Sequence, residues 1–157
     1  MYTKQKLRVQ WQGEYSESFG VSNGVKQGGV ISPVLFCVYM DDLLAKLENS
    51  GVGCYMGRVF SGAFGYADDL TLLSPSIVAL KKMISICSSY ALEHDIKFNG
   101  SKSQMIIFKG NSQRSENPHI EINGSKIEIF KSVTHLGHIL HDNIYNSDLS
   151  KCLNDFN

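Results

Sequence analysis

Two stretches of the chain carry apolar residues at the spacing of an amphipathic helix. The first begins at Ser32-Pro33, where serine suits the N-cap and proline the first helical position. It ends at Asn49-Ser50-Gly51, because glycine adopts the C-terminal conformation without strain. Its apolar positions are Phe36, Met40, Leu43, Leu44 and Leu47. The second helix is predicted from Pro75 or Ser76 to about Glu93, with an apolar face of Ile77, Leu80, Ile84, Cys87 and Leu92.

The other apolar residues occur in short alternating or β-branched runs, which are typical of strands. Asn123-Gly124 separates two such runs and predicts a two-residue hairpin. A polar loop is expected at residues 110–119. The expected strands are residues 7–11, a hairpin within 52–65, then 70–73, 105–108, 120–122 paired with 126–130, and 133–140. This order predicts an α+β domain in which an antiparallel sheet carries helices on one face.

Composition narrows the classes of protein. The 157 residues suit one domain or a piece of a larger one, and 43% of them are apolar, which is enough for a core. Lys plus Arg and Asp plus Glu each number 15, so the net charge is zero. That balance disfavours a free-standing nucleic-acid binder, whose affinity rests on neutralising phosphates. The longest apolar run, residues 34–40, is too short to span a bilayer.

Cysteine usage bears on the compartment. The four cysteines are far apart and contain no Cys-x-x-Cys pair, and the N-terminus does not read as a secretory segment. We therefore expect reduced thiols in an intracellular protein, cytoplasmic or nuclear, that is not secreted. No membrane association is expected.

The stretch with the clearest chemistry is Phe64-Gly65-Tyr66-Ala67-Asp68-Asp69-Leu70-Thr71-Leu72-Leu73. It places two adjacent carboxylates, Asp68 and Asp69, at the turn of an apolar hairpin. Like charges held together cost stability unless a cation offsets them, and hard divalent cations prefer carboxylate oxygens. The pair therefore predicts a Mg²⁺ site, with Mn²⁺ as a substitute, of the kind used in two-metal phosphoryl transfer.

A second match to the pattern Tyr-x-Asp-Asp occurs at Tyr39-Met40-Asp41-Asp42. It lies within the first predicted helix, whose apolar spacing runs through it. Asp41 and Asp42 would then point about a third of a turn apart on a helix flank. We interpret this second match as a solvated helix face and assign the metal site to Asp68 and Asp69.

Three histidines at three-residue spacing, His135, His138 and His141, resemble a metal-ligand set. A strand or loop would not align all three side chains, so we interpret them as surface histidines.

Four blocks of sequence together are specific to one family. They are Gly24-Val25-Lys26-Gln27-Gly28-Gly29-Val30-Ile31-Ser32-Pro33 with its continuation to Phe36, Tyr66 to Leu73, Phe98-Asn99-Gly100-Ser101-Lys102, and His135-Leu136-Gly137-His138-Ile139-Leu140. In this order and spacing the chain resembles reverse transcriptases, in particular those of non-LTR (LINE-type) retrotransposons. The resemblance runs from about Leu7 to Asp142.

The resemblance implies a polymerase palm and assigns roles by position. Asp68 matches the palm aspartate that binds the catalytic Mg²⁺ ions, and Asp69 matches its less directly coordinating neighbour. Lys102 matches a lysine that neutralises or protonates the leaving pyrophosphate, although a surface lysine at a strand start is an equal alternative. The implied partners are an RNA template, a DNA primer and deoxynucleotides.

The resemblance also assigns two contact segments. Gln27, Gly28 and Gly29 match a loop where bare backbone approaches template and incoming nucleotide, which glycine permits. The alternative is a simple turn before the helix. Leu136 and Gly137 match the hairpin that grips the primer end. Residues 1–142 are then a partial domain of palm and the start of a thumb, followed by a polar tail at 143–157.

Two departures from the family pattern matter. Lys26 stands where the family commonly has proline. More important, the family places a further catalytic aspartate upstream of the Gly-rich loop, whereas the first aspartate here is Asp41, and the earlier acids are Glu14 and Glu17. We therefore expect a truncated palm that does not polymerise alone. The alternatives are the palm of a group II intron or retron enzyme, and a non-catalytic relic that binds nucleic acid or protein.

Overall fold

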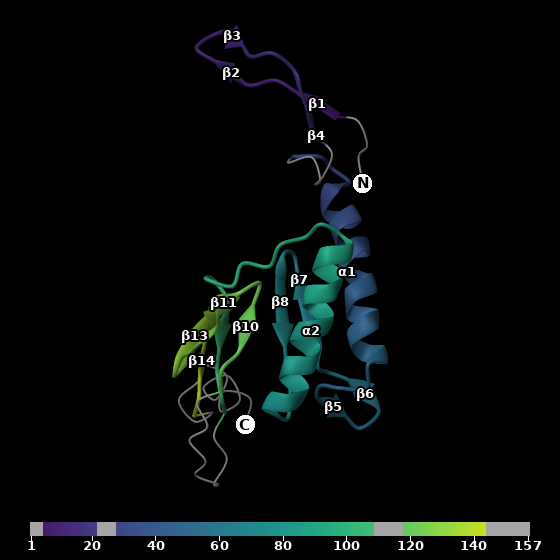
Figure 1. Ribbon diagram of the computed structural model, residues 1–157, viewed down its shortest axis with the longest axis vertical. Helices are drawn as coiled ribbons and strands as arrows, with labels where there is room; N and C mark the ends of the chain where they lie inside the picture. Colours follow the sequence, from purple (N-terminus) through teal and green to yellow (C-terminus); the bar gives the residue numbers. More distant parts are fainter. Residues whose placement is uncertain (1–4, 22–27, 109–117, 144–157) are drawn as a thin grey trace, which may run out of the picture. The chain divides into compact units, whose positions relative to one another are not determined.

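The computed structural model describes residues 5–21, 28–108 and 118–143. It is an α+β structure in which two helices accompany short two-stranded pairings (Figure 1). The chain divides into two compact units, Met1–Asp95 and Ile96–Asn157, and each unit is described by itself. Within the described residues no helix is both long and apolar enough to cross a membrane.

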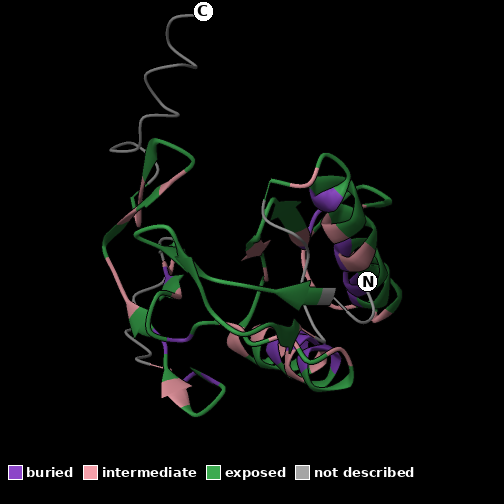
Figure 2. Ribbon diagram, turned by 90° about the horizontal axis from the view of Figure 1, so that it is seen from above, coloured by how far each residue is buried: buried purple, intermediate pink, exposed green. Residues whose placement is uncertain are grey.

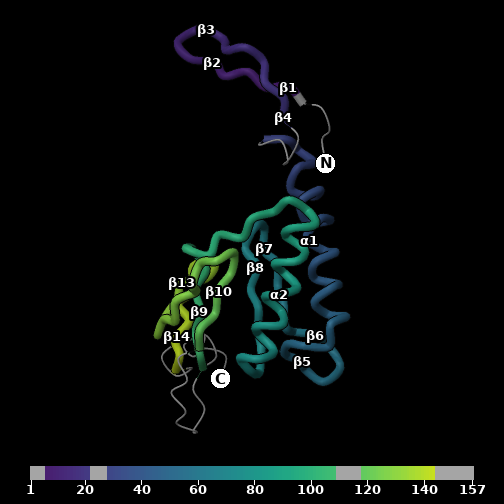
Figure 3. The backbone as a smooth tube through the Cα atoms, viewed as in Figure 1, coloured from purple at the N-terminus to yellow at the C-terminus, as the bar shows by residue number. Residues whose placement is uncertain are grey.

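The described part of the first unit contains two helices and four antiparallel strand pairings. Figure 3 follows the chain from α1 through the short strands to α2. The elements, in chain order, are β1 (Gln5–Leu7), β2 (Gln10–Trp11), β3 (Glu14–Tyr15), β4 (Phe19–Val21), α1 (Ser32–Asn49), β5 (Tyr55–Met56), β6 (Val59–Phe60), β7 (Ala63–Tyr66), β8 (Asp69–Leu72) and α2 (Ile77–Glu93). The pairings are β1 with β4, β2 with β3, β5 with β6, and β7 with β8.

The core of the first unit lies where α1 meets α2 (Figure 2). Burying each large apolar side chain there stabilises the fold by about 1.5–3 kcal/mol. The buried residues of the two helices are Ser32, Met40, Leu43 and Leu47 on α1, and Met83, Ile84, Cys87, Tyr90 and Ala91 on α2. The predicted apolar face of α1 is therefore confirmed at Met40, Leu43 and Leu47.

Two details of the predicted helices are wrong. Ser32 is the first helical residue and is buried, and the cap is Ile31, which makes no side-chain cap hydrogen bond. Leu92, expected on the apolar face of α2, is 86% exposed. The buried positions near the end of α2 are instead Tyr90 and Ala91. Tyr90 is buried against α1, where its hydroxyl donates a hydrogen bond to the Tyr39 carbonyl. At the start of α2, the Ser76 side chain accepts a hydrogen bond from the Ala79 N–H (3.2 Å), which confirms that predicted start.

The second unit consists of short strand pairings. They are β9 (Gln104–Met105), β10 (Glu121–Ile122), β11 (Ser125–Lys126), β12 (Glu128–Ile129), β13 (Ser132–His135) and β14 (His138–His141). β10 pairs with β11 and β13 with β14, both antiparallel, whereas β9 and β12 pair in parallel. The predicted Asn123-Gly124 hairpin is confirmed, with φ of +51° and +73° at its two central residues.

Four strand predictions need correction. The strand predicted at 126–130 pairs with Glu121–Ile122 only at its start, and its later part, β12, pairs with β9. The strand predicted at 105–108 is limited to Gln104–Met105, and its parallel partner departs from an all-antiparallel sheet. The single strand predicted at 133–140 is a hairpin, because Leu136-Gly137 turns the chain. The strand predicted at 7–11 is interrupted between β1 and β2. The predicted loop at 110–119 lies largely outside the described residues, apart from Pro118 and His119.

Candidate functional site

The predicted acidic turn is confirmed as the tip of the β7–β8 hairpin. Tyr66 pairs with Asp69, so Ala67 and Asp68 form the two-residue connection. Ala67 has φ of +50°, a region that costs a side chain with a Cβ about 1–2 kcal/mol. The β5–β6 hairpin has a connection of the same length, and there glycine, Gly57 (φ +62°), takes the equivalent position. Of these two turns, the β5–β6 turn has glycine at the residue with positive φ, whereas the acidic turn has alanine there.

The two faces of the β7–β8 hairpin have different environments. Successive side chains of a strand point to opposite faces, so Tyr66 and its partner Asp69 share a face with Phe64. Phe64 and Tyr66 are 50% and 64% exposed. Gly65 belongs to the other face, where a Cβ would lie 3.6 Å from Leu44 Cδ1 of α1. Asp69 therefore stands on the open face of the hairpin, beside two exposed aromatic rings.

Asp68 and Asp69 are both exposed, and neither forms an ion pair with a described residue. Within the described parts of the chain, no group of three or more His, Cys, Asp or Glu side chains is arranged to hold a metal ion. Two adjacent carboxylates fit part of the coordination shell of Mg²⁺, which usually keeps several waters and takes only one or two carboxylates from the protein. The chemistry of this donor set fits a half-site.

The second Tyr-x-Asp-Asp match lies in α1, as predicted, and its tyrosine has a packing role. The Tyr39 hydroxyl donates to the His94 carbonyl (3.0 Å), and the Tyr90 hydroxyl donates to the Tyr39 carbonyl (2.5 Å). Burial, with a smaller contribution from Asp42, raises the pKa of Tyr90. Asp41 and Asp42 are exposed on the helix. This match therefore joins the middle of α1 to the end of α2.

The predicted Gly-rich loop is described only at its end. Gly28 has φ of +76° with open space where a Cβ would lie, and the Gly29 carbonyl accepts a hydrogen bond from the Ser32 N–H (3.1 Å). Gln27 and Lys26 lie outside the described residues. That this bend faces the acidic turn stays a prediction.

The turn that carries Lys102 belongs to the second unit and is built around Asn99. The Asn99 Oδ1 accepts hydrogen bonds from the Ser101 hydroxyl (2.7 Å) and the Lys102 N–H (3.3 Å). The Asn99 carbonyl accepts from the Ser103 hydroxyl (2.9 Å). Lys102 itself is exposed, and its ammonium forms no ion pair with a described residue. The local network thus fixes the backbone of Lys102 and leaves its charge open to a ligand.

Leu136 and Gly137 form the turn of the β13–β14 hairpin, between the directly paired His135 and His138. Leu136 has φ of +49° and is 50% exposed, although a bulky apolar residue rarely adopts this conformation. His141 pairs with Ser132 at the other end. An exposed leucine held at positive φ is an unusual tip, and backbone outliers of this kind cluster at ligand-contacting sites.

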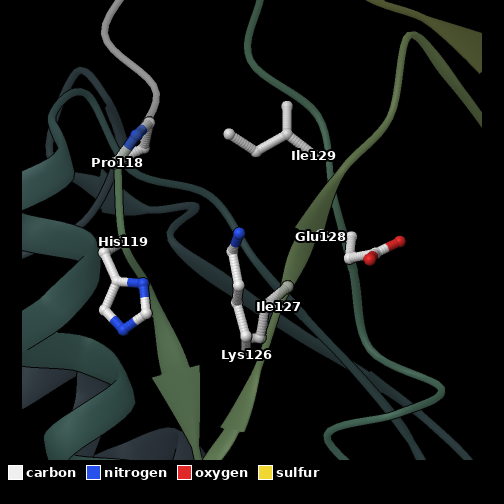
Figure 4. Close-up of a pocket in the computed structure, with 6 residues that line it drawn as sticks. All are labelled: Pro118, His119, Lys126, Ile127, Glu128 and Ile129. Carbon is white, nitrogen blue, oxygen red and sulfur yellow. The ribbon is translucent and has the colours of Figure 1, made fainter.

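A cavity of about 270 Å³ lies elsewhere in the second unit (Figure 4). None of the predicted site residues lines it. Nearby, His119 Nε2 is 2.6 Å from Glu121 Oε1, and both side chains are largely exposed. The residues around the cavity are Pro118, His119, Lys126, Ile127, Glu128 and Ile129. The cavity is therefore not part of the predicted site.

The site residues fall in the two separate units. Asp68, Asp69, Gly28 and Gly29 belong to the first, and Lys102, Leu136 and Gly137 to the second. Prediction from sequence missed two contacts of the segment that carries Lys102, the hydrogen bond from Asn123 to the Phe98 carbonyl and the close approach of Gly100 to Ser125, because each joins residues far apart in the sequence. The local signal that could have prompted a search was the Asn123-Gly124 dipeptide, which was read only as a turn.

Comparison with known proteins identifies the family. The family model described as reverse transcriptase (RNA-dependent DNA polymerase) matches residues 1–140. The chain therefore belongs to the reverse transcriptase family, as the sequence blocks indicated, and its relatives are those of non-LTR retrotransposons.

Three relatives show the extent of the similarity. The Pol polyprotein of the type-2 retrotransposable element R2DM from Drosophila melanogaster is 34% identical over 98 residues, which are 62% of this chain and 9% of that protein. A Pol polyprotein of the type-1 element R2 from Popillia japonica is 30% identical over 95 residues, 60% of this chain and 13% of that protein. The RNA-directed DNA polymerase of the mobile element jockey from Drosophila funebris is 28% identical over 141 residues, 86% of this chain and 15% of that protein. The chain thus spans a small part of the relatives it matches.

Proposed function

We propose that this chain is the palm portion of a non-LTR retrotransposon reverse transcriptase, an RNA-directed DNA polymerase. The single observation that carries the proposal is the exposed Asp68-Asp69 pair at a two-residue hairpin turn, with no ion-pair partner among the described residues. Residues 1–142 are the palm with the start of a thumb, and 143–157 are a tail. In this proposal the short strand pairings belong to one palm sheet in the parent enzyme.

Asp68 and Asp69 are the residues that would hold Mg²⁺, or Mn²⁺ in its place. When bound, the metal supplies electrostatic stabilisation of the charge that develops as a primer 3′-hydroxyl attacks the α-phosphate of a deoxynucleotide. Asp68, in the turn, contributes the main carboxylate, and Asp69, at the start of β8, the neighbouring one. Further ligands come from water, substrate phosphate or a carboxylate outside this pair.

The remaining residues orient substrates. The Gly28-Gly29 backbone would approach the template and the incoming nucleotide, and the open space beside Gly28 supports this role. Gln27, assigned to the same contact, lies outside the described residues. Lys102 supplies a positive charge, or a proton from its Nζ, to the departing pyrophosphate.

The Leu136-Gly137 tip contacts the primer end, and its exposed leucine supports this role. The macromolecular partners are an RNA template and a DNA primer, which implies an intracellular site of action in the cytoplasm or nucleus.

The test is metal binding by the purified chain, for which the chain supplies its own control. Mn²⁺ binding, followed by water-proton relaxation, should be weak in the wild type and reduced at least fivefold in Asp68→Ala. Asp42→Ala removes a carboxylate from the same tetrapeptide pattern in α1 and should leave binding unchanged. Equal losses in the two variants would refute the assignment of the site.

The isolated chain is expected not to extend a primer, because the family's upstream aspartate has no counterpart before Asp41. Template-dependent synthesis above an Asp68→Ala control would contradict this expectation.

One observation favours a second candidate function, in which the chain is a non-catalytic relic that binds nucleic acid. The β1–β4 segment exposes large rings, with Trp11 75% and Tyr15 62% exposed, and exposed rings can stack on bases. Salt-dependent RNA binding that is lost in Trp11→Ala and unchanged in Asp68→Ala would support the relic.

A further inference from the structure

Two turns of the second unit that are distant in sequence are joined by a side-chain hydrogen bond. The Asn123 amide Nδ2 donates to the Phe98 carbonyl over 2.7 Å. Phe98 directly precedes Asn99, the residue around which the Lys102 turn is built. The bond therefore links the β10–β11 turn to the base of the segment that carries Lys102.

The same two turns also meet through backbone. Gly100 is buried, and a Cβ built on it would lie 2.5 Å from Ser125 Cβ and 2.9 Å from the Ile122 carbonyl oxygen. Neither atom is the far end of a flexible side chain, so the contact cannot yield easily. Only glycine allows this approach, and it brings the Lys102 turn against both ends of the Asn123-Gly124 connection.

The amide of Asn123 is not required by the hairpin itself. The hairpin needs a residue that tolerates φ of +51°, and glycine or aspartate would meet that need. Two other two-residue connections of the same kind place Gln12 (φ +48°) and Leu136 (φ +49°) at this position. The side-chain amide of Asn123 therefore serves something other than the conformation of its own hairpin, because its hydrogen-bond acceptor, the Phe98 carbonyl, belongs to the other turn.

We propose that Asn123 is a positioning residue that holds the Lys102 turn in one orientation. The Gly100 contact sets how closely the two turns approach, and the directional bond from Asn123 prevents one turn from rotating on the other. The backbone of Lys102 is then fixed through Asn99, so the flexible side chain that carries the ammonium starts from a fixed Cα. This inference rests on the proposed role of Lys102 toward pyrophosphate.

The experiment measures amide-water exchange residue by residue in the full chain by NMR, in wild type, Asn123→Gly and Asn123→Asp. Both variants keep a residue suited to positive φ and lose the donor. Losing one exposed hydrogen bond should speed exchange at the Lys102 and Ser103 amides by between about twofold and tenfold. The Ile127 amide, which donates to the Ile120 carbonyl over 2.8 Å beside the hairpin, should not change.

The alternative outcomes are distinct. Faster exchange at Ile127 in both variants, with or without a change at Lys102, would mean that Asn123 only shapes its own hairpin, and would overturn the proposal. So would unchanged exchange at Lys102 and Ser103 in both variants. If Asn123→Gly does not fold, Asn123→Asp decides alone.

A titration with inorganic pyrophosphate separates this proposal from the function on which it rests. The Lys102 and Ser103 signals of the wild type should move on addition of pyrophosphate, and less at the same concentration in the two variants. If the wild-type Lys102 and Ser103 signals do not move on addition of pyrophosphate, the proposed role of Lys102 is wrong. The exchange rates then still decide whether Asn123 positions the turn.

Discussion

Replacing Gly100 with alanine tests the contact between the two turns most directly. The backbone of Gly100 is not at positive φ, so alanine itself is conformationally acceptable there. The added Cβ would, however, stand 2.5 Å from Ser125 Cβ and 2.9 Å from the Ile122 carbonyl oxygen. A real Cβ does not approach other atoms this closely, so the turns must separate.

The expected cost follows from this crowding. Inserting a methyl group into a packed site that cannot relax destabilises a protein by about 1–3 kcal/mol. At 1.36 kcal/mol for each factor of ten, the Ile127 amide should exchange about 5-fold to 150-fold faster in Gly100→Ala under conditions where exchange reports stability. The exchange of the Lys102 and Ser103 amides should rise as well, because their turn loses its support.

Gly124→Ala is the matched control, since it adds the same methyl group to the neighbouring turn. Gly124 has φ of +73° and no atom within 4 Å of a built Cβ, so its substitution introduces strain without a clash. It should destabilise the hairpin by about 1–2 kcal/mol and leave the Lys102 amide unaffected. If Gly100→Ala changes neither the Ile127 nor the Lys102 amide, the docking of the two turns is wrong.

Three further predictions concern the first unit. Leu43 of α1 is fully buried, so Leu43→Ala should lower the free energy of unfolding by about 2–5 kcal/mol in urea denaturation followed by circular dichroism; a loss below about 1 kcal/mol would contradict this packing. Burial raises the pKa of the Cys87 thiol from 9.0 to about 12, so the unfolded chain loses this proton first and stability should be retained below pH 9 and fall between pH 9 and 12. Urea midpoints across this range should show a smaller decline in Cys87→Ala. Iodoacetamide at pH 8 should modify the exposed Cys37 while leaving Cys87 unmodified until the chain unfolds.

Local sequence signals predicted individual elements because each depends on a few neighbouring residues. Helical spacing and the serine at position 76 located both helices, and the Asn123-Gly124 dipeptide located a hairpin by its need for positive φ. The same reasoning misplaced Leu92, because its spacing only roughly matched the apolar face. It also took residues 133–140 as one strand, because Leu136 is not a residue that usually turns a chain.

The sequence by itself determined the family and the position of the acidic pair at a hairpin turn, since motif order survives without any knowledge of packing. Tertiary structure decided how Tyr39 is used, since its hydroxyl and its carbonyl join α1 to the end of α2. It alone joined Asn123 to Phe98 and seated Gly100 against Ser125. Contacts of this kind depend on how two turns approach in space, and no periodicity along the chain encodes that distance.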